Sequence, residues 1–276
     1  MLEDPSDTAK LMDNDTIYVS YKKLEEFTRD FLPQINTTFV LITIPFGVSY
    51  PTGIDLLAPK IAGHKNLLHW FATNIGNYTR GYQFHPQISP FPLGLKPKMT
   101  GLNNCRWIWR NPVPYYRNIF LETMNTTNTT KTNSIFVGYL SRTHDDRKNV
   151  PSGRKLPYET YLRKIAESSY VISPNGIRPD CHRHYEAIGL GSVPITALDP
   201  YLYSHLKEGQ TMYANKNWNL TDLERTLPFP APKVNRTLIF EEYWMEYVER
   251  IVGRSLYWWD RVSGKKLTLQ DFARKA

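Results

Sequence analysis

Apolar and polar positions alternate along the chain in two periods, one typical of strands and one typical of helices. The runs 38–45 (TFVLITIP) and 134–140 (SIFVGYL) are short, apolar and rich in β-branched or aromatic residues, so each predicts a buried strand. Residues 157–168 and 240–251 instead carry apolar side chains every three or four positions, which predicts helices with one core-facing stripe. Short strands that alternate with helices indicate an α/β fold.

The segment 169–196 (SYVISPNGIRPDCHRHYEAIGLGSVPIT) predicts a strand, a loop, a helix and a second strand. Residues 174–176 stop the first strand, Pro179 suits the first turn of a helix, and Gly189 and Gly191 end that helix. In such a βαβ unit the helix begins at the carboxyl edge of a parallel sheet, where open α/β folds bind ligands. Backbone N–H groups and the helix dipole at this point favour an anion such as a pyrophosphate.

Three charged residues of this helix, Asp180, Arg183 and Glu186, are spaced by three and therefore share one face. Arg183 could donate two hydrogen bonds to phosphate oxygens, and Glu186 could accept hydrogen bonds from ribose hydroxyls. Asp180 could hold Arg183 or cap the helix. The same spacing is also typical of a solvated ladder of ion pairs on a surface helix, and spacing alone leaves both interpretations open.

The segment resembles the signature of exostosin-like glycosyltransferases, in which a Ser-Pro-x-Gly loop leads into Asp-x-x-Arg, Glu-Ala, a Gly and a Pro-Ile strand. The matching residues are Ser173, Pro174, Gly176, Asp180, Arg183, Glu186, Ala187, Gly191, Pro194 and Ile195. Residues 70–74 (WFATN), 92–94 (PLG) and 243–244 (YW) are similar to further blocks of algal and viral members, collinear over roughly residues 38–250. The resemblance implies a GT-B-like fold, with two facing Rossmann-like domains and the nucleotide held mainly by the C-terminal one.

The Asn/Thr-rich run 125–133 is polar and aperiodic, and it predicts a linker. We therefore expect an N-terminal, acceptor-side α/β domain over residues 1–124 and a nucleotide-sugar-binding domain over residues 134–238. A C-terminal helical segment over residues 239–276 completes the predicted organisation.

The resemblance implies transfer of a sugar from a nucleotide sugar, a UDP-sugar by analogy, to a glycan or glycoprotein acceptor with inversion at the anomeric carbon. The expected donor-site residues are Gly138, Arg142, Ser173, Asn175, Gly176, Asp180, Arg183 and Glu186. Gly138 would allow close backbone approach, and Arg142 would neutralise the departing diphosphate, although an arginine there also fits a solvated surface position.

An inverting transferase needs a base within hydrogen-bond reach of the acceptor hydroxyl. Asp55, His64 and His69 in the N-terminal half are the candidates. Exostosin-like proteins often carry acidic residues in the loop after the strand that 38–45 matches, whereas this loop holds only Asp55. Two further hypotheses therefore stay open: a non-catalytic nucleotide-sugar-binding partner of another transferase, and a secreted glycan-binding module.

No metal cofactor is expected. Residues 13–15 spell the Asp-x-Asp by which many GT-A enzymes hold a divalent metal, but they precede an apolar run instead of following a strand. His182 and His184 with Cys181 suggest zinc, but the positions on a helix are expected to face different directions.

The net charge of +8 comes from dispersed lysines and arginines without a nucleic-acid-binding motif, so no nucleic-acid partner is expected. Seven N-x-[ST] sequons indicate a lumenal or extracellular chain, and the resemblance implies the Golgi lumen or membrane. No apolar run reaches the ~18 residues of a transmembrane segment. Whether Cys105 and Cys181 form a disulfide stays open.

Overall fold

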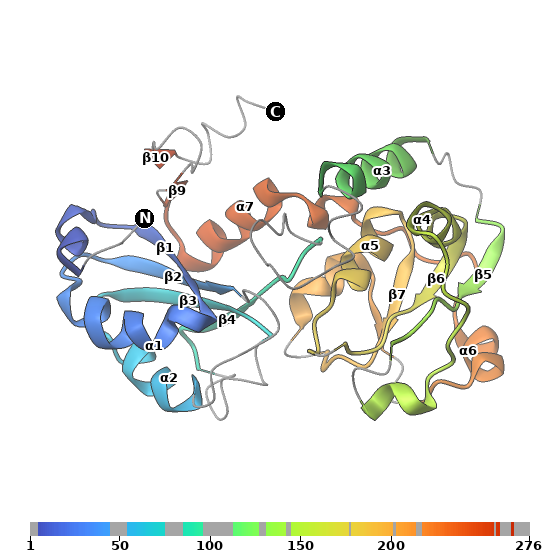
Figure 1. Ribbon diagram of the computed structural model, residues 1–276, viewed down its shortest axis with the longest axis horizontal. Coiled ribbons are helices and arrows are strands. Elements are labelled where there is room, and N and C mark those ends of the chain that lie inside the picture. The colour runs from blue at the N-terminus through green and yellow to red at the C-terminus, as the bar shows by residue number, and fades with distance from the viewer. Residues whose placement is uncertain are drawn as a thin grey trace. The chain divides into compact units, whose positions relative to one another are not determined.

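The computed structural model describes residues 5–44, 54–74, 85–95, 113–126, 131–141, 145–176, 178–200, 203–213, 217–256, 258–259 and 266–267. The chain forms two compact units, which are described separately. Unit 1 comprises residues 1–93 and 240–276, and unit 2 comprises residues 94–239 (Figure 1).

Unit 1 contains a parallel four-stranded sheet in the order β1 (Asp15–Ser20), β2 (Phe39–Ile44), β3 (Leu67–Thr73), β4 (Ile88–Phe91). Its other elements are η1 (Pro5–Lys10), η2 (Tyr21–Lys23), α1 (Leu24–Glu26), η3 (Phe27–Phe31), η4 (Leu32–Gln34), α2 (Ile54–Ala62), α7 (Glu241–Val252) and the antiparallel pair β9 (Trp258–Trp259) and β10 (Lys266–Leu267). Figure 1 shows α1 and α2 on one face of the sheet and α7 on the other.

The core between the sheet of unit 1 and α7 explains why the last helix belongs to this unit. Val40, Ile42 and Phe71 of β2 and β3 pack with Met245 and Val248 of α7. The predicted strand at 38–45 is therefore confirmed as β2, and the predicted helix at 240–251 is confirmed as α7. Two members of the predicted stripe, Phe240 and Ile251, are exposed, because the buried side of α7 is centred on Trp244, Met245 and Val248.

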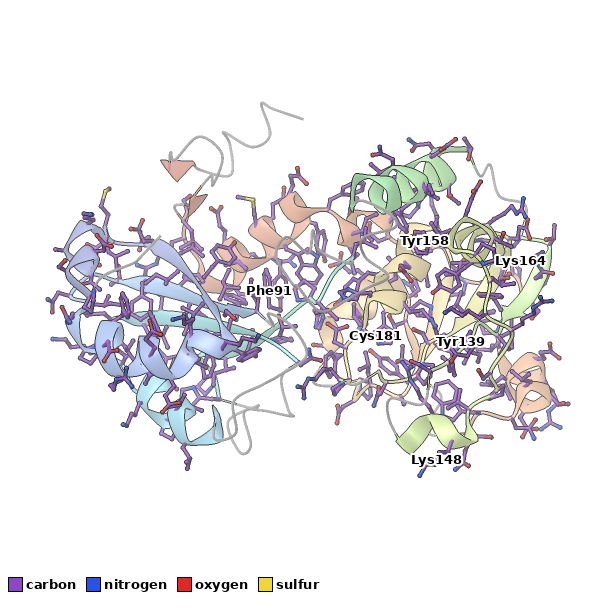
Figure 2. All side chains as sticks on the ribbon, viewed as in Figure 1. Phe91, Tyr139, Lys148, Tyr158, Lys164 and Cys181 are labelled. Atoms are coloured by element: carbon purple, nitrogen blue, oxygen red, sulfur yellow. The ribbon has the colours of Figure 1, made fainter. Side chains whose placement is uncertain are left out.

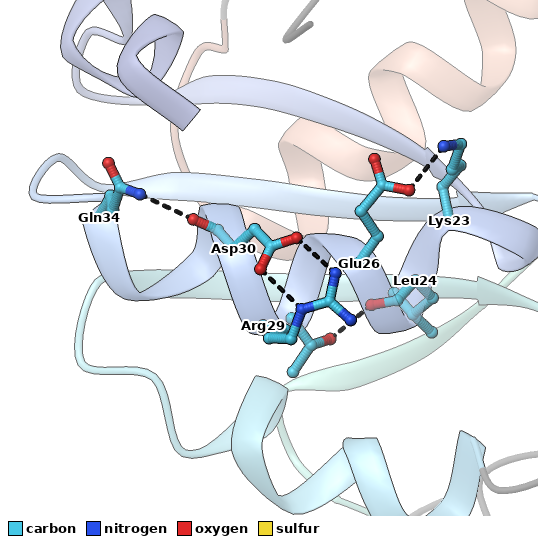
Figure 3. A network of polar contacts seen from close by, with 7 residues as sticks. Lys23, Leu24, Glu26, Arg29, Asp30 and Gln34 are labelled. Carbon is cyan, nitrogen blue, oxygen red and sulfur yellow. Dashed lines mark hydrogen bonds and ion pairs between the residues drawn. The ribbon is translucent and has the colours of Figure 1, made fainter. Parts of the chain in front are cut away.

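The helical connection between β1 and β2 carries its charged side chains on the solvent side. Arg29 donates two hydrogen bonds of 2.7 Å to the Asp30 carboxylate, and Lys23 pairs with Glu26 (Figure 3). Thr28 Oγ1 donates to the carbonyl of Leu24 at 2.7 Å. Exposed ion pairs of this kind contribute little to stability, so the connection is held mainly by its buried apolar residues.

Unit 2 contains a second parallel sheet in the order β5 (Asn133–Phe136), β6 (Ser168–Ile172), β7 (Val193–Thr196), β8 (Met212–Tyr213). Its other elements are α3 (Val113–Thr126), η6 (Asp145–Asn149), α4 (Tyr158–Ala166), α5 (His182–Gly189), η7 (Ser204–Gly209), α6 (Leu220–Thr226) and η8 (Arg236–Ile239). One core joins Val171 of β6 to Phe120 of α3, Leu162 and Ile165 of α4, and Ala187 of α5.

The two four-stranded parallel sheets confirm the expected α/β class and are consistent with a Rossmann-like two-domain fold. The division of the chain differs from the predicted one. It falls after residues 93 and 239, whereas the sequence suggested a break at 125–133. The difference arises because α3 packs through Phe120 on the core of unit 2, and because Asn125 and Asn133 lie within α3 and β5.

Lys131, next to β5, joins the ends of two helices of unit 2. Its ammonium group donates to the carbonyls of Ala166 (2.9 Å) and Leu190 (3.2 Å) and to Ser192 Oγ (3.0 Å). Ala166 ends α4 and Leu190 follows α5, so the cation satisfies carbonyl groups that helix ends leave without partners. Burial, together with the charge of Arg236, lowers the pKa of Lys131 from 10.5 to about 8.

This pKa predicts a stability that rises with pH between 8 and 10.5. In that window the unfolded chain still holds the lysine proton while the folded chain has released it, so raising the pH favours the folded state. We expect a gain of about 1–2 kcal/mol in the free energy of unfolding, after allowance for partial solvent exposure. Urea titrations of the wild type and of Lys131→Met across this range isolate the effect, because other groups titrate alike in both. Parallel pH dependences would contradict it.

Within the described residues, no helix combines the length and the apolar character needed to cross a bilayer.

Candidate functional site

The candidate site lies at the carboxyl edge of the unit 2 sheet. Because the strands are parallel, the segments that follow them emerge at the same edge. Residues 137–141 follow β5, and the loop 173–181 leads from β6 into α5. The predicted strand–loop–helix–strand order of 169–196 is confirmed, with the helix spanning His182–Gly189.

Arg183, in the first turn of α5, is held by the protein through two of its nitrogens. Nη2 donates to the carbonyl of Tyr139 at 2.8 Å, and Nε donates to the hydroxyl of Tyr161 at 3.1 Å. The third nitrogen, Nη1, is buried without a hydrogen-bond partner among the described residues. A buried donor of this kind costs free energy unless an acceptor reaches it, so Nη1 is the group of Arg183 that is suited to an incoming anion.

Glu186, one turn further along α5, is connected to Arg183 through Tyr161. The hydroxyl of Tyr161 donates to Glu186 Oε2 at 2.9 Å while it accepts from Arg183. Tyr158 donates to Oε1 at 3.5 Å. Burial and the neighbouring Glu186 carboxylate raise the pKa of Tyr161 well above its ordinary value, so the hydroxyl stays a donor. The carboxylate keeps unused lone pairs for further donors such as ribose hydroxyls.

Asp180 occupies a different place from the one that its spacing suggested. Its carboxylate is buried and accepts a hydrogen bond of 2.8 Å from the hydroxyl of Tyr185. The N-cap residue of α5 is Cys181, so the expectation that Asp180 caps this helix is wrong. Asp180 instead fixes the start of α5 from within the unit.

The loop after β6 is fastened by two polar residues. Ser173 Oγ lies 2.8 Å from His184 Nδ1 in a buried contact. Arg147 of η6 donates through Nε to the carbonyl of Asn175 and through Nη1 to that of Ser141 at 3.1 Å. A Cβ atom on Gly176 would lie 3.4 Å from Arg147 Nη2, which is an ordinary contact, so the position of this arginine does not require glycine there. Arg147 thus ties the β5 and β6 loops together.

Gly138 and Arg142 complete the predicted set. A Cβ atom on Gly138 would lie 3.1 Å from the Phe136 ring and 3.4 Å from Tyr161, so a larger residue there would have to displace the Phe136 ring by a few tenths of an ångström. Arg142 lies outside the described residues.

Cys181 and His184 form a pair at the start of α5. Cys181 Sγ lies 3.5 Å from His184 Nε2, and the thiol is free. Burial opposes charge on both groups, but their mutual attraction prevails, so the pKa of Cys181 is lowered and the pKa of His184 is raised. His182 points elsewhere and contacts the carbonyl of Gly94 at 2.8 Å. In the described parts of the chain no group of three or more His, Cys, Asp and Glu side chains could hold a metal.

The candidate bases all lie in unit 1. His69 of β3 is buried, lies 2.8 Å through Nε2 from Ser89 Oγ, and has its pKa lowered to about 4 by burial and the charge of His85. It is therefore neutral at physiological pH. His64 Nδ1 accepts from the backbone N–H of Asn66 at 3.3 Å, and burial lowers its pKa. Asp55 lies in α2, and its side chain lies outside the described residues.

The Asp-Asn-Asp sequence at 13–15 has local partners at the start of β1. Asp13 Oδ1 accepts from the backbone N–H and the hydroxyl of Thr38, each at 2.8 Å, and these bonds lower its pKa. Asp15 Oδ2 accepts from the N–H of Met12 at 2.9 Å. Both carboxylates therefore have hydrogen-bond partners within the protein at the start of β1.

The structure brings together Arg183, Glu186 and the β6 loop with three residues that the sequence pattern does not indicate for the site: Tyr139, Arg147 and Tyr161. The only sequence signal for Tyr161 was its place in the apolar stripe of the helix at 157–168, which predicted a core position. A helix N-terminus beside a fixed guanidinium can bind an anionic ligand.

The chain matches no protein-family model, and a search of curated proteins gives no significant match.

Proposed function

We propose that the protein is a glycosyltransferase whose unit 2 binds the diphosphate of a nucleotide sugar at the start of α5. The observation that carries the proposal is Arg183 Nη1, a buried donor without a partner among the described residues, on a guanidinium fixed by Tyr139 and Tyr161. A phosphate oxygen would satisfy this donor with a charge-assisted hydrogen bond, and the N-terminus of the eight-residue helix α5 would add its dipole.

Glycosyl transfer from a nucleotide sugar builds up negative charge on the leaving diphosphate. Arg183 and the helix N-terminus are proposed to stabilise that charge, and Glu186, one turn further along the helix, is proposed to accept hydrogen bonds from the ribose hydroxyls. Arg142 is proposed to add a second positive charge. Attack by an acceptor hydroxyl in a single displacement would invert the anomeric carbon, with Asp55, His64 or His69 as the base.

The resemblance to exostosin-like proteins supports the finer parts of this proposal: a GT-B arrangement, a UDP-sugar donor and a glycan or glycoprotein acceptor. A Golgi location is proposed from the same resemblance and from the sequons, of which Asn36, Asn125 and Asn219 have exposed side chains. Association with another transferase is proposed if the protein itself lacks turnover.

Isothermal titration calorimetry with UDP and GDP, followed by an assay with radiolabelled donor and an acceptor panel, tests the proposal. Binding with turnover is the expected result. Nucleotide binding without turnover would favour a non-catalytic partner of another transferase. Absence of any nucleotide affinity, with glycan binding retained, would favour a glycan-binding module.

We expect nucleotide binding to be independent of divalent metal. The affinity for UDP in EDTA should lie within about twofold of that with added Mn²⁺, because Arg183 and the helix N-terminus supply the positive charge. Calorimetry in the two buffers measures this directly. Loss of binding in EDTA that Mn²⁺ restores would refute the expectation and point to a metal-dependent site.

A further inference from the structure

Tyr139 is an exposed aromatic residue at the carboxyl edge of the unit 2 sheet. Its exposed fraction is 46%, and it lies three residues beyond the end of β5 (Figure 2). Single exposed tyrosines are common on protein surfaces, so exposure alone does not indicate a binding role. What distinguishes Tyr139 is its backbone carbonyl, which accepts the hydrogen bond from Arg183 Nη2 at 2.8 Å.

The backbone on both sides of Tyr139 is held in place by the segment 152–153. The carbonyl of Gly138 accepts from the N–H of Gly153 at 3.2 Å, and the N–H of Leu140 donates to Ser152 Oγ at 2.9 Å. A Cβ atom on Gly153 would lie 2.1 Å from the carbonyl oxygen of Val137, so only glycine permits this close approach. Three consecutive residues are therefore fixed while the Tyr139 ring stays open to solvent.

A ring on a fixed backbone loses little conformational freedom when a flat ligand stacks on it. Stacking on an aromatic side chain contributes binding free energy for any nucleobase, because every base has a π-face. The main-chain carbonyl of Tyr139 accepts a hydrogen bond from the Arg183 guanidinium, to which we assign the diphosphate. The nucleoside is covalently joined to that diphosphate.

We infer that Tyr139 is the stacking platform for the base of the bound nucleotide, an inference that rests on the proposed nucleotide site. Stacking engages the ring face and not a hydrogen-bonding edge, so Tyr139 contributes affinity for uracil and guanine alike. Discrimination between bases must come from other groups.

Calorimetry with UDP, GDP and inorganic pyrophosphate on folded variants tests this inference. Tyr139→Ala should weaken UDP and GDP binding by about 5- to 150-fold, the measured range for loss of base stacking. Its affinity for pyrophosphate, which has no base, should change by less than about twofold, since the main-chain carbonyl that holds Arg183 remains. Tyr139→Phe keeps the ring and should bind UDP as the wild type does. Tyr139→Leu keeps the apolar character without the aromatic face, so it should behave as Tyr139→Ala and replaces that variant if it fails to fold.

The outcomes separate this inference from the proposed function. Unchanged UDP affinity in Tyr139→Ala, with wild-type binding intact, would overturn the stacking role and leave the proposed site standing. Equal losses for UDP and pyrophosphate would show that Tyr139 acts only by positioning Arg183, which also overturns stacking, as would a Tyr139→Phe variant as weak as Tyr139→Ala. A wild-type protein that binds neither UDP nor GDP would overturn the proposed function and this inference with it.

Discussion

The Arg183→Ala variant is expected to bind UDP about 10- to 150-fold more weakly than the wild type, which corresponds to the 1.5–3 kcal/mol of a charged hydrogen bond. The substitution removes the buried Nη1 donor, the group that a phosphate oxygen would satisfy. The affinity for inorganic pyrophosphate should fall by a similar factor, because the lost contact is to the diphosphate. Calorimetry with both ligands measures the two losses on the same protein.

Arg163→Ala is a matched control for this variant. Arg163 lies on the neighbouring helix α4, is mostly exposed, and forms a long ion pair of 4.0 Å with Glu167. Its removal changes the net charge by the same amount as Arg183→Ala, so unchanged UDP affinity in Arg163→Ala would show that the effect is local. Wild-type affinity in a folded Arg183→Ala variant would remove this site from consideration.

The βαβ unit of the site could be predicted from the sequence because its signals are local. Gly191 adopts a positive φ of 74° directly after α5, which is a conformation that glycine favours and that its place after the helical pattern indicated. The spacing of Arg183 and Glu186 predicted a shared helix face, and Tyr161 connects the two side chains by hydrogen bonds in the structure. Helix periodicity alone predicts that Arg183 and Glu186 share a helix face, without any tertiary contact.

The partners of those side chains could not be predicted, because they come from distant parts of the chain. Tyr161 lies 22 residues before Arg183, and Tyr139 lies 44 residues before it. A tyrosine in an apolar stripe predicts burial, and nothing in the stripe specifies which polar group its hydroxyl meets. Only the packing of α4 beside α5 determines that pairing.

The division into two units differs from the one that the sequence predicts for a related reason. The amphipathic pattern of α7 shows which of its sides is buried, but it does not show that the partner strands are β2 and β3, which lie far earlier in the chain. The low-complexity run at 125–133 looked like a linker by composition. Its first residues nevertheless end a helix whose Phe120 belongs to the core of unit 2.

In unit 1 the largest expected effect comes from Trp70, a fully buried residue of β3. Trp70→Ala should lower the free energy of unfolding by about 3–5 kcal/mol, because it removes a large apolar side chain and leaves a cavity that the sheet cannot close. Leu56→Ala serves as the control: Leu56 on α2 is 75% exposed, so its truncation should change stability by less than about 0.5 kcal/mol. Urea titrations followed by far-UV circular dichroism measure both values. A Trp70→Ala loss as small as that of Leu56→Ala would contradict the burial of this residue.

The hydrogen bond of the Trp70 indole can be separated from its packing. Nε1 donates to Thr43 Oγ1 at 2.9 Å, and Thr43 is itself fully buried in β2. Trp70→Phe keeps most of the ring volume but leaves the threonine hydroxyl without its donor, at a cost of about 1–3 kcal/mol. Adding Thr43→Val removes the orphaned hydroxyl, so the double variant should be more stable than Trp70→Phe by about 1 kcal/mol. A double variant that is no more stable than Trp70→Phe would contradict the expectation that losing the indole donor leaves a costly unpaired hydroxyl on Thr43.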